Sequence, residues 1–292
     1  MNDAGKLVES GRAWHGPKRI GAIMADMGLL SQQQIALVLE TMQREAGILF
    51  GETCAKLALL TTEEVGRALA LQFGYDDIGD IPEQVPLALD SVRHPSGAQA
   101  QEIRSVRNFL MRNWFCDQRK TLAIIGVESG AGASTFAAGL AVSFAQTKME
   151  TLLIDADLRS GIQREIFHLQ ERHGLSETLM TDVGLQRICR VDQYKTLSVL
   201  PSGAANPNQL DLLSHPEYAC LCDLVRQRFD VVLIDTPAFS TGHDALETAA
   251  VAGGALIVIQ KNVSSTKALR ALKDSLAAQR TSIVGYVFND FI

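Results

Sequence analysis

The sequence predicts an α/β protein with a doubly wound, mostly parallel β-sheet, preceded by a small all-α domain of repeated helical hairpins. Three observations predict this fold. A glycine-rich loop at 126–135 joins a strand pattern to a helical pattern. Apolar segments at 152–154 and 231–234 are each followed by an acid, and residues 19–72 repeat with an offset of 30. In parallel sheets such strands are buried on both faces, and ligands bind beyond their carboxyl ends.

The N-terminal repeat predicts two packed helical hairpins. Gly21 matches Gly51, and Leu29-Leu30 matches Leu59-Leu60. Each unit breaks at a capping box, Ser31-x-x-Gln34 and Thr61-x-x-Glu64, which satisfies N–H groups at the start of a helix. We therefore expect a helical repeat domain at 1–75. Three prolines and no sustained period predict a linker at 76–97, so the α/β domain spans 98–292.

Composition limits the partners and the compartment. The 292 residues are 47% hydrophobic and carry a formal charge of −6, which does not favour nucleic acid or an anionic membrane as the main partner. Five cysteines without a secretory signal suit a reducing cytoplasm, and Cys220-x-Cys222 lacks the second pair of a zinc site. The longest uncharged apolar stretch, 249–259, is too short for a bilayer. We expect a cytoplasmic protein that reaches a membrane only through a partner.

The loop from Gly126 to Thr135 has the frame of a phosphate-binding loop but lacks its lysine. Glycines in this setting let backbone N–H groups surround phosphate oxygens, and the hydroxyl of Ser134 or Thr135 can bind Mg²⁺. The lysine position holds Ala133. The loop alone is therefore consistent with a nucleotide site or with a simple glycine-rich turn between a strand and a helix.

Three acids follow the apolar strands. Asp155 and Asp157 lie at alternate positions after one strand, and Asp235 follows another. Carboxylates opposite a phosphate loop can hold Mg²⁺ or accept a proton from an attacking hydroxyl. Each acid could instead cap the helix that follows its strand. The order of loop and acids favours the nucleotide site.

Residues from about 98 to 292 resemble a bacterial tyrosine kinase of the MinD/ParA-like P-loop group, which serves capsule and exopolysaccharide export. The resemblance is to the chain-length-determinant-associated tyrosine kinase of exopolysaccharide clusters. Its Walker A′ and Walker B motifs match 153–159 and 233–237. Its Walker A loop matches Ser129, Gly130, Ala131, Gly132, Ala133 and Ser134.

The resemblance implies a site for ATP or ADP with Mg²⁺, bound by the Walker A residues and Thr135. It implies that Ser134 ligates Mg²⁺ while Asp157 and Asp235 hold it mainly through water. It further implies that Asp155 is the candidate catalytic base. Asn289 would lie near the adenine. Arg159 could contact phosphate or form a structural ion pair with Asp235.

Departures from the family pattern bear on activity and assembly. Relatives carry lysine or arginine at Ala133, and alanine cannot stabilise the charge of a transferring phosphoryl group. Lys148 or Lys261 are candidates to replace that cation. The tyrosine-rich tail is absent, and the family's E-x-x-R-x-x-R helix begins with Gln101. Arg104 and Arg107 remain on one helical face, so we expect a homo-oligomer contact there.

Residues 1–75 resemble the N-terminal domain of type II secretion and pilus assembly ATPases, some of which bind cyclic di-GMP. Arg19 and Gln72 match polar positions of that motif, whereas Met42 and Leu49 depart from it. A protein-docking module and a cyclic di-GMP site at Arg19 and Gln72 are both consistent with this pattern.

Together these features predict a tyrosine-autokinase-like protein of exopolysaccharide biosynthesis and export that binds ATP. It would regulate chain length or export with a membrane chain-length determinant, the polysaccharide copolymerase. Ala133 predicts impaired phosphoryl transfer, that is, a pseudokinase. The alternative is a non-enzymatic adaptor or cyclic di-GMP-sensing regulator that uses the N-terminal domain.

Overall fold

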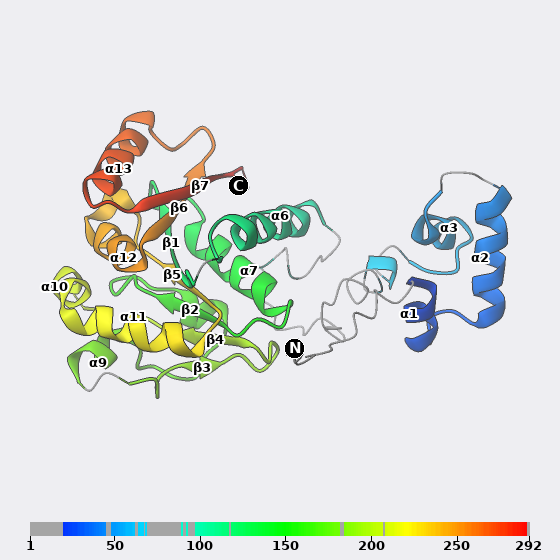
Figure 1. Cartoon of the computed structure of the whole chain (residues 1–292), viewed down its shortest axis with the longest axis horizontal. Helices are drawn as coiled ribbons and strands as arrows, with labels where there is room; N and C mark the ends of the chain where they lie inside the picture. The colour runs from blue at the N-terminus through cyan, green and yellow to red at the C-terminus, as the bar shows by residue number, and fades with distance from the viewer. Residues whose placement is uncertain are drawn as a thin grey trace, which may run out of the picture. The chain divides into compact units, whose positions relative to one another are not determined.

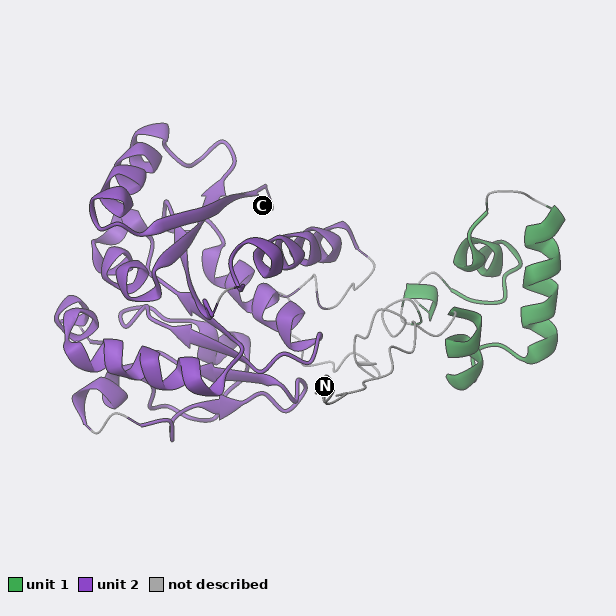
Figure 2. Cartoon of the chain, viewed as in Figure 1, with its two compact units in different colours: residues 1–77 green, residues 78–292 purple. Residues whose placement is uncertain are grey.

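The chain divides into two compact units, residues 1–77 and 78–292 (Figure 2). The computed structural model describes residues 20–44, 48–61, 64–66, 68, 89, 92, 97–116, 118–181, 184–206 and 208–290. Most of the predicted linker at 76–97 lies outside these residues, as do Arg19 and Gln72. The predicted domain boundaries therefore stay predictions.

Unit 1 is helical over its described residues. Its helices are α1 (Ile20–Asp26), α2 (Gln32–Arg44) and α3 (Phe50–Lys56). They enclose a small apolar core in which Met24, Val38 and Cys54 are fully buried. The segment that would form a fourth helix is described only at 64–66 and 68, so the two-hairpin domain remains a prediction.

Both predicted capping boxes are formed in unit 1. Ser31 N–H donates to Gln34 Oε1 at 2.8 Å while Gln34 N–H donates to Ser31 Oγ at 3.3 Å. Thr61 N–H donates to Glu64 Oε2 at 2.7 Å, and Glu64 N–H donates to Thr61 Oγ1 at 3.2 Å. The reciprocal bonds satisfy N–H groups that an isolated helix start leaves without partners.

The repeat extends to the turns that end α1 and α3. Gly28 has φ 71° and Ala58 has φ 50°, so both adopt the left-handed conformation. In the next residues, Leu29 N–H donates to Met24 O at 2.9 Å and Leu59 N–H to Cys54 O at 3.0 Å. A hydrogen bond from the N–H of residue i to the carbonyl of residue i−5 is the mark of a Schellman cap, which therefore ends both helices. The sequence repeat is thus also a repeat of backbone geometry.

Unit 2 is built on a seven-stranded sheet with the order β3-β4-β2-β5-β1-β6-β7. Every described pairing is parallel except β3 with β4. The strands are β1 (Thr121–Gly126), β2 (Thr151–Asp155), β3 (Cys189–Arg190), β4 (Leu197–Leu200), β5 (Val231–Asp235), β6 (Gly254–Gln260) and β7 (Ser282–Asn289). The prediction of a mostly parallel sheet is confirmed.

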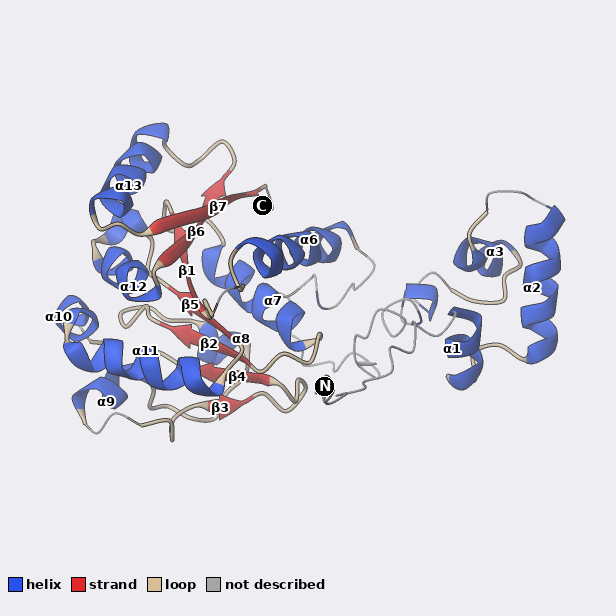
Figure 3. Ribbon diagram, in the orientation of Figure 1, coloured by secondary structure: helices blue, strands red, loops and turns tan. Residues whose placement is uncertain are grey.

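Helices cover both faces of the sheet (Figures 1 and 3). One face packs against α6 (Ala98–Asn113), α7 (Ala133–Ala145) and the short α8 (Gln163–Ile166). The other packs against α11 (Pro216–Arg228), α12 (Asp244–Ala252) and α13 (Thr266–Ala278). The remaining short elements are α9 (Leu175–Met180), α10 (Gln209–Ser214) and a 3₁₀ turn, η1 (Phe239–Thr241).

Side chains alternate between the two faces of the sheet along each central strand, and apolar side chains on both faces explain why both are buried. Leu122 and Ile124 of β1 face the α6 and α7 side, whereas Ala123 and Ile125 face the α12 and α13 side. All four are fully buried, as a doubly covered parallel strand requires. None of the helices in the described ranges is long and apolar enough to cross a bilayer.

Candidate functional site

The glycine-rich loop connects β1 to the N-terminus of α7, as predicted. Gly130 and Gly132 have φ values of 81° and 79°, which L side chains rarely adopt. These turns lead directly into α7, which begins at Ala133. The first N–H groups of a helix have no intrahelical partner and carry partial positive charge. The loop therefore ends in a backbone site suited to an anion.

Asn289, at the end of β7, supports this loop. Its Nδ2 donates to Ala131 O at 2.9 Å. A Cβ atom at Gly132 would lie 2.2 Å from the same amide nitrogen, so only glycine allows the approach. The predicted position of Asn289 near an adenine remains a prediction, because here its amide lies against the loop backbone.

Asp155 and Asp235 lie side by side at the ends of β2 and β5. They are register partners in the sheet, and both are buried, with exposures of 0% and 1%. Asp155 accepts hydrogen bonds from Asp157 N–H at 3.2 Å and Gln163 N–H at 3.0 Å. Asp235 Oδ2 accepts from Gln163 Nε2 at 2.8 Å. Its Oδ1 is buried and has no hydrogen-bond partner among the described residues.

Burial makes ionisation of this carboxyl pair costly. Burial, followed by the neighbouring charge of Asp235, raises the pKa of Asp155 well above its usual range. Burial raises the pKa of Asp235 to about 7, although hydrogen bonds from the side chains of Gln163 and Ser134 partly oppose the shift. Two adjacent buried carboxyl groups of this kind are stabilised by a shared proton or by a cation.

The donor set fits a magnesium ion held jointly with phosphate. The oxygens available are the Ser134 hydroxyl, near Asp235, and the unpartnered Asp235 Oδ1. Hard oxygen donors of this type suit Mg²⁺, which usually keeps several waters and binds phosphates. Over the described parts of the chain, no group of three or more His, Cys, Asp and Glu side chains is arranged to hold a metal ion. The site therefore fits Mg²⁺ brought with a nucleotide better than Mg²⁺ alone.

Asp157 is engaged in its own turn. Its Oδ1 accepts from the N–H groups of Arg159 at 3.2 Å and Ser160 at 3.1 Å, and its Oδ2 accepts from Ser160 Oγ at 3.1 Å. The carboxylate therefore stabilises the chain reversal after β2. It still lies close enough to Asp155 and Asp235 for its charge to raise the pKa of both.

Arg159 forms an ion pair with Asp244, the first residue of α12, and not with Asp235. The Asp244 side chain is almost fully buried, at 2% exposure, whereas that of Arg159 is 44% exposed. The buried carboxylate of Asp244 thus holds the guanidinium of Arg159. This interaction accounts for the Asp at the start of α12.

The two lysines considered as substitutes for the missing loop cation lie in different places. Lys148 follows the C-terminus of α7, and a 13-residue helix spans about 20 Å, so it is far from the loop. Lys261 follows β6 on the loop side of the sheet, where its N–H donates to Asn289 O at 2.9 Å. Its ammonium lies 3.5 Å from Asp290. Of these two lysines, only Lys261 lies on the edge of the sheet that carries the glycine-rich loop.

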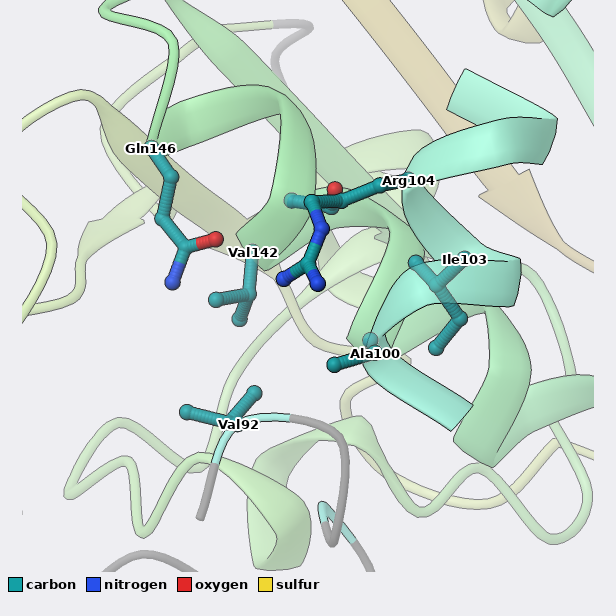
Figure 4. A pocket seen from close by; sticks show the side chains of 8 residues that line it. Val92, Ala100, Ile103, Arg104, Val142 and Gln146 are labelled. Carbon is teal, nitrogen blue, oxygen red and sulfur yellow. The ribbon is translucent and has the colours of Figure 1, made fainter. Parts of the chain in front are cut away.

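Arg104 and Arg107 occupy different environments on α6. Arg107 is 4% exposed, and its Nη1 donates to Ser143 O at 2.9 Å and to Ser143 Oγ at 3.2 Å. It therefore joins α6 to α7 within the unit. Arg104 lines a shallow hollow between these helices together with Gln146 (Figure 4). The predicted oligomer contact through these arginines remains a prediction.

Gln163 was not recognised in the sequence, yet it lies at the centre of the site. It begins α8, is fully buried, and its Nε2 donates both to Asp235 Oδ2 at 2.8 Å and to Ser134 O at 3.0 Å. Gly161 makes this placement feasible, because a Cβ there would lie 2.5 Å from Asp155 Oδ2 and 2.4 Å from Ser202 Oγ. The only sequence signal was position, within a few residues of Asp157.

The fold and the loop define an α/β nucleotide-binding protein of the P-loop class, and the comparisons agree. Residues 119–283, more than half of the chain, match the AAA domain family. The chain is 30% identical over 199 residues to the tyrosine-protein kinase YwqD of Bacillus subtilis, covering 68% of this chain and 84% of YwqD. The protein therefore belongs to the bacterial tyrosine kinases of the P-loop AAA-domain family.

Solved structures support the same assignment. The kinase domain of the Escherichia coli tyrosine kinase Etk superposes with a TM-score of 0.65 at 26% identity, over 70% of this chain and 78% of that domain. The Pyrococcus horikoshii septum site-determining protein MinD, complexed with Mg-ADP, superposes with a TM-score of 0.52 at 20% identity, over 59% of this chain and 70% of that one. The likeness to MinD shows the fold alone. The AAA-domain match begins at residue 119, so it does not test the resemblance of residues 1–75 to secretion ATPases.

Proposed function

We propose that the protein binds ATP or ADP with Mg²⁺ at the loop of 126–135 and acts as a kinase-like component of exopolysaccharide biosynthesis and export. In this proposal it regulates chain length or export together with a membrane chain-length determinant, and it reaches the inner membrane only through that partner. Its phosphoryl transfer is impaired. The observation that carries the proposal is the buried Asp155 and Asp235 pair beside a phosphate loop whose lysine position is Ala133.

Each part of the site has a defined role in this proposal. The N–H groups at the start of α7 would bind phosphate oxygens. Ser134 would ligate Mg²⁺, with Asp235 and Asp157 holding its waters, and the ion would neutralise phosphate charge. Asp155 would accept the proton of an attacking hydroxyl, and burial, which raises its pKa, makes its ionised form a stronger base.

Impaired phosphoryl transfer follows from the missing positive charge at Ala133. A methyl group supplies no positive charge to the transferring phosphoryl group, and the guanidinium of Arg159, a candidate phosphate contact, is paired with Asp244. Loss of one preorganised stabilising group typically lowers kcat by about 100- to 1,000-fold. Nucleotide binding depends more on the loop backbone, so we expect it to be weakened and to persist.

The test is nucleotide binding and phosphoryl transfer by the wild type and by Ala133→Lys. We expect the wild type to bind MgATP weakly in calorimetry and to transfer little phosphate to tyrosine. Ala133→Lys should bind at least tenfold more tightly and gain transfer activity. Asp155→Asn in the lysine background is the matched control and should lose transfer while keeping binding.

Two results would contradict the proposal. Robust tyrosine phosphorylation by the wild type that disappears in Asp155→Ala would show that transfer is not impaired. Absence of nucleotide binding by both the wild type and Ala133→Lys would remove the nucleotide site and favour a non-enzymatic adaptor.

The repeated caps of unit 1 support a second candidate, in which this unit docks a partner or senses cyclic di-GMP. Two capping boxes and two matching left-handed turns indicate a module with its own defined shape. Calorimetry with cyclic di-GMP on the full chain tests the sensing version. We expect Arg19→Ala or Gln72→Ala to abolish any binding, and no heat with the wild type would leave only the docking version.

A further inference from the structure

Both N–H groups of the Gln163 carboxamide donate hydrogen bonds to residues of the proposed magnesium site. One reaches Asp235 Oδ2 at 2.8 Å and the other reaches Ser134 O at 3.0 Å. A side-chain amide has two such donors, so none is left over. The Gln163 main-chain N–H also donates to Asp155 Oδ2, at 3.0 Å. One residue thus ties both buried acids to the first turn of α7.

We infer that Gln163 is a positioning residue whose amide competes with a divalent cation for Asp235. The inference rests on the proposed function, in which Asp235 takes part in holding Mg²⁺. The amide presents its hydrogens, which repel a cation, to Oδ2 of Asp235, and it leaves only Oδ1 of that carboxylate without a partner among the described residues. This hydrogen bond partly neutralises the charge of the buried Asp235 carboxylate.

The consequence is a lowered affinity for divalent cations. A cation that takes Oδ2 of Asp235 must break the bond from Gln163 Nε2, whereas one that takes only Oδ1 meets a carboxylate whose charge this amide already partly neutralises. Because a hydrogen bond to a buried charged group is strong, either route should reduce the affinity by about tenfold to a hundredfold. Gln163 would therefore weaken the binding of metal alone at this carboxylate.

The opposite orientation of the Gln163 carboxamide predicts the opposite change in cation affinity. Gln163 Oε1 is buried and has no hydrogen-bond partner in the described part of the chain. A carboxamide turned by 180° would direct Oε1 toward the cation and act as a ligand. In that case the removal of the amide would weaken cation binding instead of strengthening it. The two geometries are therefore separated by the sign of one affinity change.

The experiment is a titration of the full chain with Mn²⁺ alone, in which electron paramagnetic resonance measures the free ion. Gln163→Met removes the amide at similar volume. Gln209→Met is the matched control, because Gln209 is also a fully buried glutamine of unit 2 and neither of its amide atoms has a hydrogen-bond partner among the described residues. Gln163→Asn, whose shorter amide cannot span Asp235 and Ser134, carries the test if Gln163→Met does not fold.

We expect Gln163→Met to bind Mn²⁺ about tenfold or more tightly than the wild type, and Gln209→Met to match the wild type. Equal or weaker binding by Gln163→Met, or no Mn²⁺ binding by either protein, would overturn the inference. The titration contains no nucleotide. Tighter Mn²⁺ binding without any nucleotide binding by the wild type would therefore contradict the proposed function and leave the inference intact.

Discussion

The buried carboxyl pair makes the stability of unit 2 depend on pH, and Asp235→Asn measures the effect. Burial raises the pKa of Asp235 to about 7 in the folded protein. Asparagine keeps the shape of the side chain and retains an oxygen that can accept the bond from Gln163. The substitution removes the titrating group and, with it, the charge that raises the pKa of Asp155.

The magnitude follows from the difference between the folded and unfolded pKa values. An unfolded aspartate has a pKa of about 3.9, and each pKa unit corresponds to about 1.36 kcal/mol. Because the folded state binds this proton more tightly, the free energy of unfolding falls as the pH rises from about 4 to about 7. The deficit is about 1.5 kcal/mol at pH 5 and about 4 kcal/mol at pH 8. Asp235→Asn should recover that deficit.

The assay is urea unfolding followed by circular dichroism at pH 5 and at pH 8, with EDTA present. The stability advantage of Asp235→Asn over the wild type should grow by about 2.5 kcal/mol between the two conditions. Asp223→Asn, which removes an exposed carboxylate from α11, controls for the loss of one negative charge. An advantage that does not change with pH would refute the assignment of a raised pKa to Asp235.

Four further substitutions test the packing described above. Gly161→Ala should lower the free energy of unfolding of unit 2 by about 2–4 kcal/mol in urea unfolding, because its Cβ would collide with Asp155. Ala58→Gly should stabilise unit 1 by about 1 kcal/mol and Gly28→Ala should destabilise it by a similar amount, measured by hydrogen exchange; equal effects of one sign would contradict the left-handed turns. Arg107→Met should cost about 1–3 kcal/mol in thermal unfolding, since it leaves Ser143 O without that donor, and no loss would contradict its buried role.

The strands of unit 2 could be predicted because apolar runs between polar ends leave little choice. Asp155 and Asp235 each end such a run, and the parallel arrangement then brings them to one edge of the sheet. The capping boxes of unit 1 were equally accessible, since the four residues of each box form their bonds locally. Features determined by neighbours in the chain are therefore the ones that the sequence reveals.

Contacts between distant residues could not be predicted from patterns. Arg159 pairs with Asp244, 85 residues away, although Asp235 was the candidate partner. Asp157 is a candidate to hold waters of Mg²⁺, and its additional hydrogen bonds within its own turn carry no signal in the sequence. Gln163 reaches Asp235 only because the chain passes close to the Asp155 side chain at Gly161. A strand pattern identifies the edge of the sheet on which a side chain lies, but the partner depends on loop paths that carry no periodic signal.

The bond from Asn289 to Ala131 has a consequence for the order in which the protein acquires its site. The two residues are 158 positions apart, so the ribosome must add more than half of the chain after the loop before this support exists. A nascent chain that already exposes both acids still lacks the amide that steadies the loop backbone. The loop backbone therefore gains this support only after the strand that carries Asn289 has joined the sheet, and the proposed phosphate ligand would meet a steadied loop only from then on.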